Sequence, residues 1–544
     1  MISVIATNIT SPLGFTTEEN YQAVLSGCSV LRRYDGLWGL PEPFAASLFS
    51  EEQRAELAID GYTFFESLAI RSIRGALTST SLGNASSRIV LILSTTKGNI
   101  SSLGDACYFP SEAAQRIADA IGLTAQPIVV CNACVSGLSA QLLANHLLSV
   151  GLYDYAIVVG AEVQSKFIVS GFQSLKAVSE EPCRPFDIER NGLNPGEAAA
   201  TIIFARDADK EYWSLIDGAT CNDAYHNVSP SPQGEGLTNA IKAVMRDRDK
   251  SQLATVCVHG TATLYNDQME SKAIQQADLS DIPLSALKGY YGHTMGAAGV
   301  LETILTMRAT DDGIVLPSKG FTEPGVSGKV IFTSEPQKTG KRAFLKIMSG
   351  FGGCNVAALY AKTWVKEQGA GNKNQTLIKT HTIKLSSEEG ISLTDIYKRQ
   401  IGDYPKFYKM DILSRLAFVA AELLKESLPP RTWGAVILFN HSSSIASDRQ
   451  FLSTISDADA FFPSPSVFVY TLPNITAGEI AIRHHLQGET SFYILRRKDE
   501  ALMQMILEAT LQGTGVRSAI SGWVDAESET SYECELSMYE INSK

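Results

Sequence analysis

The stretch that decides the fold reads Ile128-Val-Val-Cys131-Asn-Ala-Cys134-Val-Ser-Gly137-Leu-Ser-Ala-Gln-Leu-Leu-Ala-Asn-His146-Leu-Leu-Ser-Val-Gly151. Its apolar start, small-residue centre and mostly apolar end predict a buried strand, a tight turn and a helix. Cys134 then lies near the helix N-terminus, where unpaired N–H groups and the positive end of the helix dipole favour a thiolate. The same N–H groups can donate to an oxyanion, so the segment indicates a nucleophilic cysteine.

Cys134 also has simpler interpretations. Most intracellular cysteines are small buried hydrophobic residues, and this position fits that description. Cys131 and Cys134 form a CxxC pair, which is compatible with redox or zinc chemistry. The sequence has no second CxxC and no clustered HxxxH to complete a zinc set, so no metal site is expected. His146, inside the apolar helix, is expected to be structural.

Two histidines stand at turns where strands are expected to end. His259 directly follows an apolar run and opens a turn rich in hydroxyls, whereas His293 lies in a glycine-rich turn that enters a helix. Either one alone is as often structural as catalytic. Together, two neutral imidazoles can donate hydrogen bonds to a thioester carbonyl and stabilise the enolate formed when a carboxylate leaves as carbon dioxide. Lys288 is expected to bind or polarise the same region, with Glu302 holding it.

Short apolar runs with strand character alternate with helical segments up to residue 365. The expected strands are Ile89–Leu93, Pro127–Val130, Tyr155–Val159, Ala199–Phe204, Thr255–Val258 and Arg342–Ile347. Such alternation predicts a layered α/β fold. A polar, glycine-containing stretch with little to bury predicts a linker over 366–376. The tail, 377–544, is expected to be α/β too, with a helix over Asp411–Glu426 and strands over Ala435–Phe439 and Ser491–Leu495.

Composition indicates a globular protein with several folded units. The chain has 544 residues, of which 44% are hydrophobic and 19% charged, and a formal charge of −12. This charge argues against a general nucleic-acid binder, which needs clustered Lys and Arg. No apolar run reaches the roughly 18 to 20 residues that span a bilayer, and the N-terminus lacks a basic leader, so a cytoplasmic protein is expected. Nine scattered cysteines predict reduced thiols.

Five segments, taken in order, resemble the motifs of the condensing enzymes called β-ketoacyl synthases. The family patterns are TACSSG, RPFDxxRDGFxxGEG, HGTGTxxxD, KxxxGHxxGAAG and GFGGTN. The segments here are Asn132-Ala-Cys134-Val-Ser-Gly137, Arg184-Pro-Phe-Asp187-Ile-Glu-Arg190-Asn-Gly192, His259-Gly-Thr-Ala-Thr263, Lys288 to Gly299, and Gly350-Phe-Gly-Gly353-Cys-Asn355. The resemblance covers roughly residues 1–362 and begins with Thr10-Ser-Pro-Leu-Gly14.

The resemblance implies a duplicated βαβαβαββ thiolase-like fold, five-layered αβαβα, over residues 1–365. It also implies that Cys134 takes an acyl group from a carrier-protein thioester, and that His259 and His293 promote decarboxylation of malonyl carrier. A histidine in the GHxxGAAG motif matches the elongating Cys-His-His enzymes. The implied partners are acyl- and malonyl-loaded acyl carrier protein and, in a homodimer or heterodimer, another synthase-like subunit; no cofactor is implied.

Supporting roles follow from the same match. Lys288 would belong to the catalytic group, and Phe351 would gate access to Cys134. The backbone N–H groups of Phe351 and Cys134 would form the oxyanion hole. The residues expected to support the catalytic group are Glu302, Phe351, Asn355 and Asp267.

The chain departs from the family patterns at several points. Asn132 replaces the threonine before Ala-Cys, Ala262 replaces the second glycine of HGTGT, and little sequence lies between Tyr34 and Ser87. These changes are expected to alter the pocket shape and to indicate a divergent synthase of specialised acyl or polyene metabolism. Thiolases proper use a second cysteine as base, and Cys354 occupies the threonine of GFGGTN, so a thiolase is the minor alternative.

The tail contains a second resemblance. Its segment from Phe461 to Gly488 looks like the one just upstream of a synthase nucleophile, PNMAAGQIAIRxGLxGP, yet Arg497 stands where the family carries its cysteine. The tail is therefore expected to be a degenerate, non-catalytic synthase half that docks against a synthase or shapes its tunnel, with His484 and His485 structural. In the competing hypothesis the whole protein is a non-catalytic, chain-length-factor-like partner subunit, although such partners typically lose the cysteine.

Overall fold

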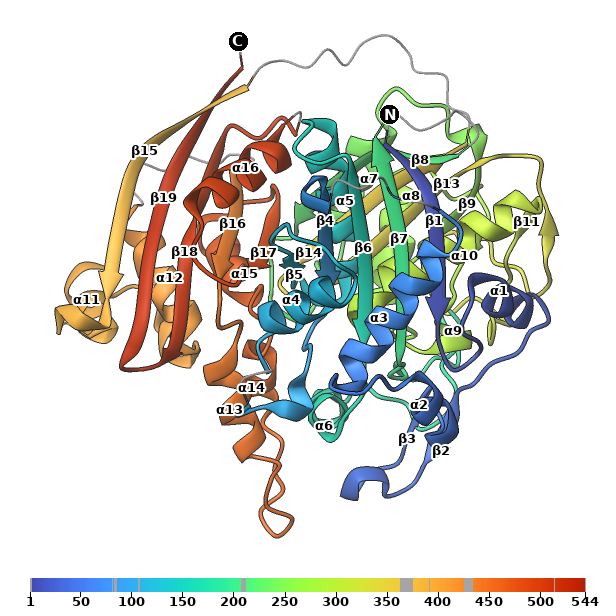
Figure 1. The fold of residues 1–544 in the computed structure, drawn as a ribbon, viewed down its shortest axis with the longest axis horizontal. Coiled ribbons are helices and arrows are strands. Elements are labelled where there is room, and N and C mark those ends of the chain that lie inside the picture. The colour runs from blue at the N-terminus through green and yellow to red at the C-terminus, as the bar shows by residue number, and fades with distance from the viewer. Residues whose placement is uncertain are drawn as a thin grey trace.

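One 15-stranded sheet runs through the computed structural model and is covered by helices (Figure 1). The structure describes residues 2–80, 82, 86–105, 108–206, 212–362, 375–390, 392–424, 434–512 and 514–543. In this part of the chain, no helix is both long enough and apolar enough to cross a membrane. The eight cysteines that it includes are all free thiols.

The sheet is built from three five-stranded units. The first has the order β5-β4-β6-β7-β1, formed by Ile128–Val130, Ile89–Ser94, Tyr155–Glu162, Ala198–Arg206 and Ile2–Thr10. The second has the order β10-β9-β13-β14-β8, formed by Leu284–Ser285, Leu253–Cys257, Ala343–Gly350, Cys354–Ala361 and Trp213–Asn222. The third has the order β17-β16-β18-β19-β15, formed by Thr490–Ile494, Gly434–Asn440, Ser518–Ser528, Ser531–Ser543 and Gln375–Ser386.

The three units share one topology. Numbered along the chain, each places its strands in the order third, second, fourth, fifth, first. In each, the third, second and fourth strands are parallel, and the fifth and first strands join antiparallel. The expected thiolase-like duplication is therefore present in residues 2–362, and the additional C-terminal α/β part repeats the same unit a third time.

The first two units face each other across a central helical layer. Helices α5 (Ser136–Ser149) and α10 (Ala298–Asp311) pack against strands of both units. The outer face of the first unit is covered by α3 (Phe64–Leu77), and that of the second by α7 (Glu235–Met245). Both central helices are buried nearly all round. They approach closely where glycines meet: a Cβ on Gly299 would lie 2.5 Å from the backbone N of Leu138. The result is the five-layered arrangement that the family resemblance implies.

The tail extends the first unit instead of forming a separate body. Strand β17 pairs antiparallel with β5, Tyr493 opposite Val130 and Ile494 opposite Val129. Beyond the last residue pair of these two strands, a side chain continues the contact: Oδ1 of Asn132 accepts a hydrogen bond from the backbone N of Phe492 at 2.7 Å. The free edge of β5 is thereby closed by a strand of the same chain.

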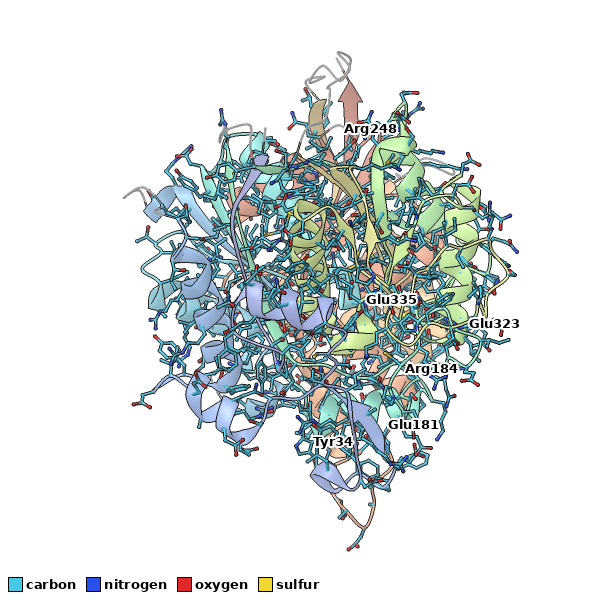
Figure 2. The ribbon with its side chains drawn as sticks, turned by 90° about the vertical axis from the view of Figure 1, so that its right-hand side faces the viewer. Tyr34, Glu181, Arg184, Arg248, Glu323 and Glu335 are labelled. Atoms are coloured by element: carbon cyan, nitrogen blue, oxygen red, sulfur yellow. The ribbon has the colours of Figure 1, made fainter. Side chains whose placement is uncertain are left out.

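The strands expected from the sequence are all present, with boundaries shifted by one to three residues. The expected tail helix is α12, Ile412–Leu423, which begins after the N-cap Asp411; residues 425–426 lie outside the described residues. Most of the expected linker over 366–376 also lies outside them. The expected end of the linker at residue 376 is wrong, because Gln375 and Thr376 already belong to strand β15 and pair with β19. In the view of Figure 2, the labelled side chains of Arg184 and Glu323 lie at the periphery of the molecule.

Candidate active site

Cys134 lies on a short 3-10 turn, Ala133–Val135, between β5 and α5. The turn is sharp: Ala133 has a left-handed φ of 48°, an unusual conformation for a residue with a Cβ. Ser136 holds it closed, because its Oγ accepts from the backbone N of Asn132 at 2.8 Å and donates to the carbonyl of Ala133 at 2.6 Å. The strand, turn and helix thus follow the order that the sequence predicts.

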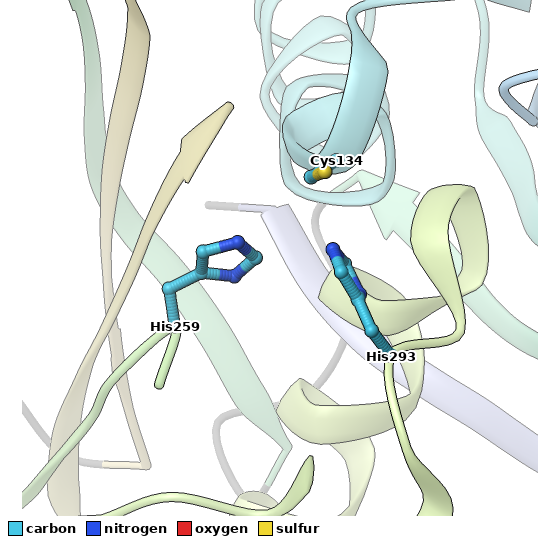
Figure 3. A group of neighbouring side chains, drawn as sticks. All are labelled: Cys134, His259 and His293. Atoms are coloured by element: carbon cyan, nitrogen blue, oxygen red, sulfur yellow. The ribbon is translucent and has the colours of Figure 1, made fainter. Parts of the chain in front are cut away.

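Three reactive side chains converge in the structure (Figure 3). The Sγ of Cys134 and ring nitrogens of His259 and His293 all lie within 4.8 Å of one another. The two imidazoles meet edge to face, with ring centroids 5.0 Å apart and an interplanar angle of 79°. Cys134 comes from the first unit, His259 follows β9 of the second, and His293 follows α9 (Lys288–Tyr291) of the second. The site therefore forms where the two units meet.

Both histidines are neutral hydrogen-bond donors. Burial lowers the pKa of His259 and of His293 well below the usual value, and the ammonium of Lys288 lowers it further. The backbone N of Met295 donates to Nδ1 of His293 at 3.2 Å, which places the ring proton on Nε2. Among the described residues, neither Nε2 of His293 nor Nδ1 of His259 has a hydrogen-bond partner, and both atoms are buried. A substrate oxygen can therefore accept from this site.

Cys134 does not match the expected thiolate. Its side chain is half-buried at the pocket, and burial raises the pKa of the thiol to about 12, although Lys288 acts in the opposite direction. Desolvation thus outweighs the helix terminus, and the resting group is a thiol. The three donor atoms are close enough to hold a soft divalent ion such as Zn²⁺, but a neutral thiol is a poor ligand for one.

Lys288 belongs to a buried charge network and does not line the pocket. Its Nζ donates to the carbonyl of His259 at 2.6 Å and lies 2.7 Å from Glu302, the contact that the sequence suggests. The second carboxylate oxygen of Glu302 lies 2.6 Å from Nζ of Lys346. Lys346 in turn donates to the carbonyl of Val258 at 3.1 Å. The network therefore holds the carbonyl groups of Val258 and His259, at the end of the strand that leads to His259.

Sequence reasoning missed three buried charged residues that hold the site. Lys346 lies in the otherwise apolar strand β13, and a charge in such a run is the signal that could have found it. Glu270 accepts from the backbone N of His259 at 2.7 Å, and burial raises its pKa to about 7. Glu162 accepts from the backbone N of Gly296, beside His293, at 2.9 Å.

The expected supporting residues fall into two groups. Asp267 lies outside the pocket, where it accepts from the backbone N of Phe186 at 2.7 Å, and burial raises its pKa to about 6. Asn355 lines the pocket and donates to Asp223 at 2.9 Å. Phe351 is half-buried at the pocket wall, and the preceding Gly350 lies against the backbone of Cys134.

The pocket in front of Cys134 has a volume of about 320 Å³. Its mouth carries Leu264 and Tyr265, which are 58% and 75% exposed. Its inner wall includes Phe172, whose ring meets that of Phe468 from the tail edge-on at 5.3 Å. A larger surface hollow of about 1220 Å³, lined by Trp38, Arg54 and Lys166 among others, shares no lining residue with this pocket.

The departures from the family patterns act away from the pocket. The expectation that Asn132 shapes the pocket is wrong, because its side chain points to β17 of the tail and is not among the lining residues. Ala262 is also absent from the lining; it is buried with a left-handed φ of 62°. Arg497 is exposed between β17 and α16 (Glu500–Leu511). His484 lies 3.2 Å from Glu422, as a structural histidine would.

Comparisons with known sequences agree with this geometry. The family description "Beta-ketoacyl synthase, N-terminal domain" matches residues 66–210, and "Beta-ketoacyl synthase, C-terminal domain" matches residues 214–322. The chain is 31% identical over 280 residues to the 3-oxoacyl-[acyl-carrier-protein] synthase 2 of Mycobacterium leprae, an alignment covering 48% of this chain and 66% of that protein. It is 27% identical over 274 residues to the tetracenomycin polyketide synthase ketoacyl synthase alpha subunit of Streptomyces glaucescens, covering 47% and 64%. The chain thus spans slightly less than two thirds of these relatives.

Solved structures agree on the fold. A β-ketoacyl synthase from Burkholderia phymatum superposes with a TM-score of 0.61 at 22% identity, covering 67% of this chain and 99% of that chain. The keto synthase–chain length factor PfaC gives a TM-score of 0.78 at 13% identity, covering 99% of this chain and 78% of that chain. The thiolase-like fold is common to all three proteins. Because both halves of the family pattern match in order and their motifs meet at one site, the region from residue 66 to residue 322 is that of a β-ketoacyl synthase.

Proposed function

We propose that this protein is a 3-oxoacyl-[acyl-carrier-protein] synthase, which joins an acyl thioester to malonyl carrier by decarboxylative Claisen condensation. The observation that carries the proposal is the convergence of Cys134 with two buried neutral imidazoles, one of which has an unpartnered Nε2–H. The pathway is fatty acid, polyketide or polyene-type biosynthesis. The family match and the relatives named above support this class of reaction.

In the first half-reaction, Cys134 takes the acyl group. Its Sγ attacks the thioester carbonyl, an Sγ–C bond forms, and the bond from that carbon to the carrier sulfur breaks. Because the resting group is a thiol, its proton must leave during the attack. A neighbouring imidazole relays this proton to the departing carrier sulfur. Backbone N–H groups of Cys134 and Phe351 stabilise the tetrahedral oxyanion.

In the second half-reaction, malonyl carrier loses its carboxylate as carbon dioxide. The electron pair of the broken C–C bond forms an enolate, whose oxygen accepts hydrogen bonds from His259 and His293. The enolate carbon then attacks the carbonyl of the Cys134 thioester, and the bond from that carbon to Sγ breaks. The product is a 3-oxoacyl carrier, and Sγ leaves as a thiolate that takes a proton from solvent to return to the resting thiol. Neutral imidazoles suit this step because their N–H groups donate hydrogen bonds to the enolate oxygen but are too weakly acidic to protonate the enolate carbon.

The proposed partner is an acyl carrier protein, loaded with acyl or malonyl groups, whose prosthetic arm enters past Leu264 and Tyr265. The chain is also proposed to assemble with a second synthase-like subunit or a second copy of itself. Such a subunit would need a surface other than the β5 edge, since β17 occupies that edge.

The tail is proposed to be non-catalytic and to close the acyl end of the pocket. A Cβ on Gly171 of helix α6 (Lys166–Ser174) would lie 2.1 Å from the Phe468 ring, so this ring fills the space beyond Phe172. Phe468 also packs against Phe451 at a centroid distance of 5.2 Å. Such an aromatic floor limits the length of the acyl chain that Cys134 can carry.

Intact-protein mass analysis tests the proposal. The protein is incubated with acyl-carrier thioesters of varied chain length and then with malonyl carrier. An acyl adduct is expected on the wild type and on Cys131→Ala, a buried control, but not on Cys134→Ala. Malonyl carrier should discharge the adduct as 3-oxoacyl product. Absence of any adduct would favour the alternative, a chain-length-factor-like partner subunit without chemistry of its own.

A further inference from the structure

The turn Phe351–Gly353, between β13 and β14, has its main chain held by three asparagines. Asn474 Nδ2 donates to the carbonyl of Phe351 at 2.8 Å. Gly352 N donates to the carbonyl of Asn227 at 2.7 Å, and Asn222 Nδ2 donates to the carbonyl of Gly352 at 2.8 Å. All three are buried, and they are called the asparagine clamp below.

Every member of the clamp depends on the tail. Asn474 is a tail residue at the start of α15 (Ile475–His484). The side chain of Asn227 donates to Glu479 Oε1 of the same helix at 2.6 Å. Asn222 belongs to β8, yet its side chain also donates to Thr490 Oγ1 of β17 at 3.0 Å. The tail therefore supplies or orients each group that fixes the turn.

The tail also packs tightly against the turn. A Cβ on Gly478 of α15 would lie 2.9 Å from the carbonyl oxygen of Gly352 and 3.0 Å from its Cα, closer than such atoms approach without displacement. Glu479 cannot move away easily, because it is fully buried and bonded to Tyr470 at 2.9 Å and to Lys406 at 2.8 Å. The packing of helix α15 therefore restricts the Phe351–Gly353 turn to one position.

The position of this turn decides the geometry at Cys134. A Cβ on Gly350 would lie 3.4 Å from the backbone N of Cys134, so the N–H of Phe351 belongs to the strand end beside the nucleophile. The β13–β14 ladder holds one side of Phe351, through the pairing of Gly350 with Cys354, and Asn474 holds its carbonyl on the other side. Donors to an oxyanion act only when they are aimed at the place where charge develops.

We propose that the tail is a positioning element of the catalytic site, in which Asn474 aims the Phe351 N–H at the oxyanion of the Cys134 acyl intermediate. This inference rests on the proposed synthase function and gives the tail a role in rate as well as in chain length. Asn474 is a positioning residue, because it contacts the turn and not the substrate.

Two variants perturb the turn by different means. Asn474→Ala removes the donor to the Phe351 carbonyl. Gly478→Ala adds a methyl group that presses on Gly352, while alanine favours the helix itself. Thr476→Val is the matched control: it lies on the same helix, is buried, and bonds to Ser414 within the tail.

The readout compares two reactions of Cys134. Acylation by an acyl-carrier thioester passes through an oxyanion, whereas alkylation by iodoacetamide does not. Asn474→Ala and Gly478→Ala are expected to slow acylation about 10- to 100-fold, the usual cost of misplacing catalytic groups by about 1 Å. Alkylation should stay at the wild-type rate in both, and both rates should be unchanged in Thr476→Val.

Every other outcome contradicts the inference. An equal fall in acylation and alkylation would mean that the tail merely holds the fold together. Unchanged acylation in both variants would mean that the clamp does not aim the donor. A wild-type protein that is alkylated but never acylated would instead refute the proposed synthase function, so the two failures are distinguishable.

Discussion

Replacing Glu302 by glutamine should remove the carboxylate that bridges two buried ammonium groups. Lys288, Lys346 and Glu302 together carry a net charge of +1, which the isosteric Glu302→Gln raises to +2. Breaking a buried ion pair by removing one partner costs about 3 to 5 kcal/mol, because the remaining charge is uncompensated. Since Lys288 also holds the carbonyl of His259, we expect condensation to fall together with stability.

The pH dependence of this effect has a definite sign. The two lysines hold the pKa of Glu302 below its usual value near 4.5, so its contribution is complete above that value and is lost as the pH falls further. Burial lowers the pKa of Lys346, but Cys257 and Glu302 together raise it above its usual value near 10.5, so the contribution of Lys346 is lost only in strong alkali. The penalty of Glu302→Gln should thus be constant from about pH 5 to 10 and shrink in acid.

Urea denaturation at pH 7 measures the effect, with Lys346→Met and the double variant as controls. Glu302→Gln with Lys346→Met restores the net charge to +1, since Lys288 then remains alone. The double variant should therefore lose about 1 to 3 kcal/mol less free energy of unfolding than the two single variants lose when their losses are added. A loss below about 1 kcal/mol in Glu302→Gln, or strict additivity, would refute the idea that this network is ionised and coupled.

Other substitutions probe the histidines, the strained turn and the acyl floor. His293→Ala should slow carbon dioxide release from malonyl carrier about 10²- to 10³-fold, as loss of an oxyanion donor does. The pKa of both histidines lies well below 6.5, so neither should give the rate of this release an inflection near pH 6.5. Glu270, whose pKa is about 7, can give one, so an inflection that persists in Glu270→Gln would contradict the assignment. Ala262→Gly should stabilise the fold by about 0.5 to 1 kcal/mol in urea, because glycine tolerates the left-handed φ of 62°, and a loss would contradict this. Phe468→Ala should shift the acyl adducts seen by mass analysis towards longer chains, whereas an unchanged profile would show that the ring does not limit length.

The local chemistry of the site was readable from the sequence because each reactive residue stands on a turn between elements. The expected strand end was wrong for His293, which follows the short helix α9. Cys134, His259 and His293 lie on turns that short apolar runs and glycines mark, and the fold brings such turns together. The protonation state of Cys134 was not readable. It depends on how completely the other unit covers the sulfur, and that burial opposes the helix terminus.

Partnerships across the fold were also beyond the sequence. Lys346 is separated from Glu302 by 44 residues, and nothing in either segment indicates that the two meet. Asn132 looked like a change inside the pocket, yet its side chain adds a hydrogen bond to the pairing of β17 with β5. The tail contacts depend on strand pairing between segments more than 350 residues apart, which local patterns do not encode.

The three repeats explain how a part without a nucleophile can still serve the reaction. The first unit supplies Cys134 after its third strand, and the second supplies His259 after its second strand and His293 beyond its third. In the third unit the turn after the third strand carries exposed Arg497, so no chemistry constrains it. Its remaining surface packs against β5 and against the Phe351–Gly353 turn, where buried asparagines demand fixed partners. We therefore expect the third unit to serve the site through a rigid surface that holds the Phe351–Gly353 turn in a single position.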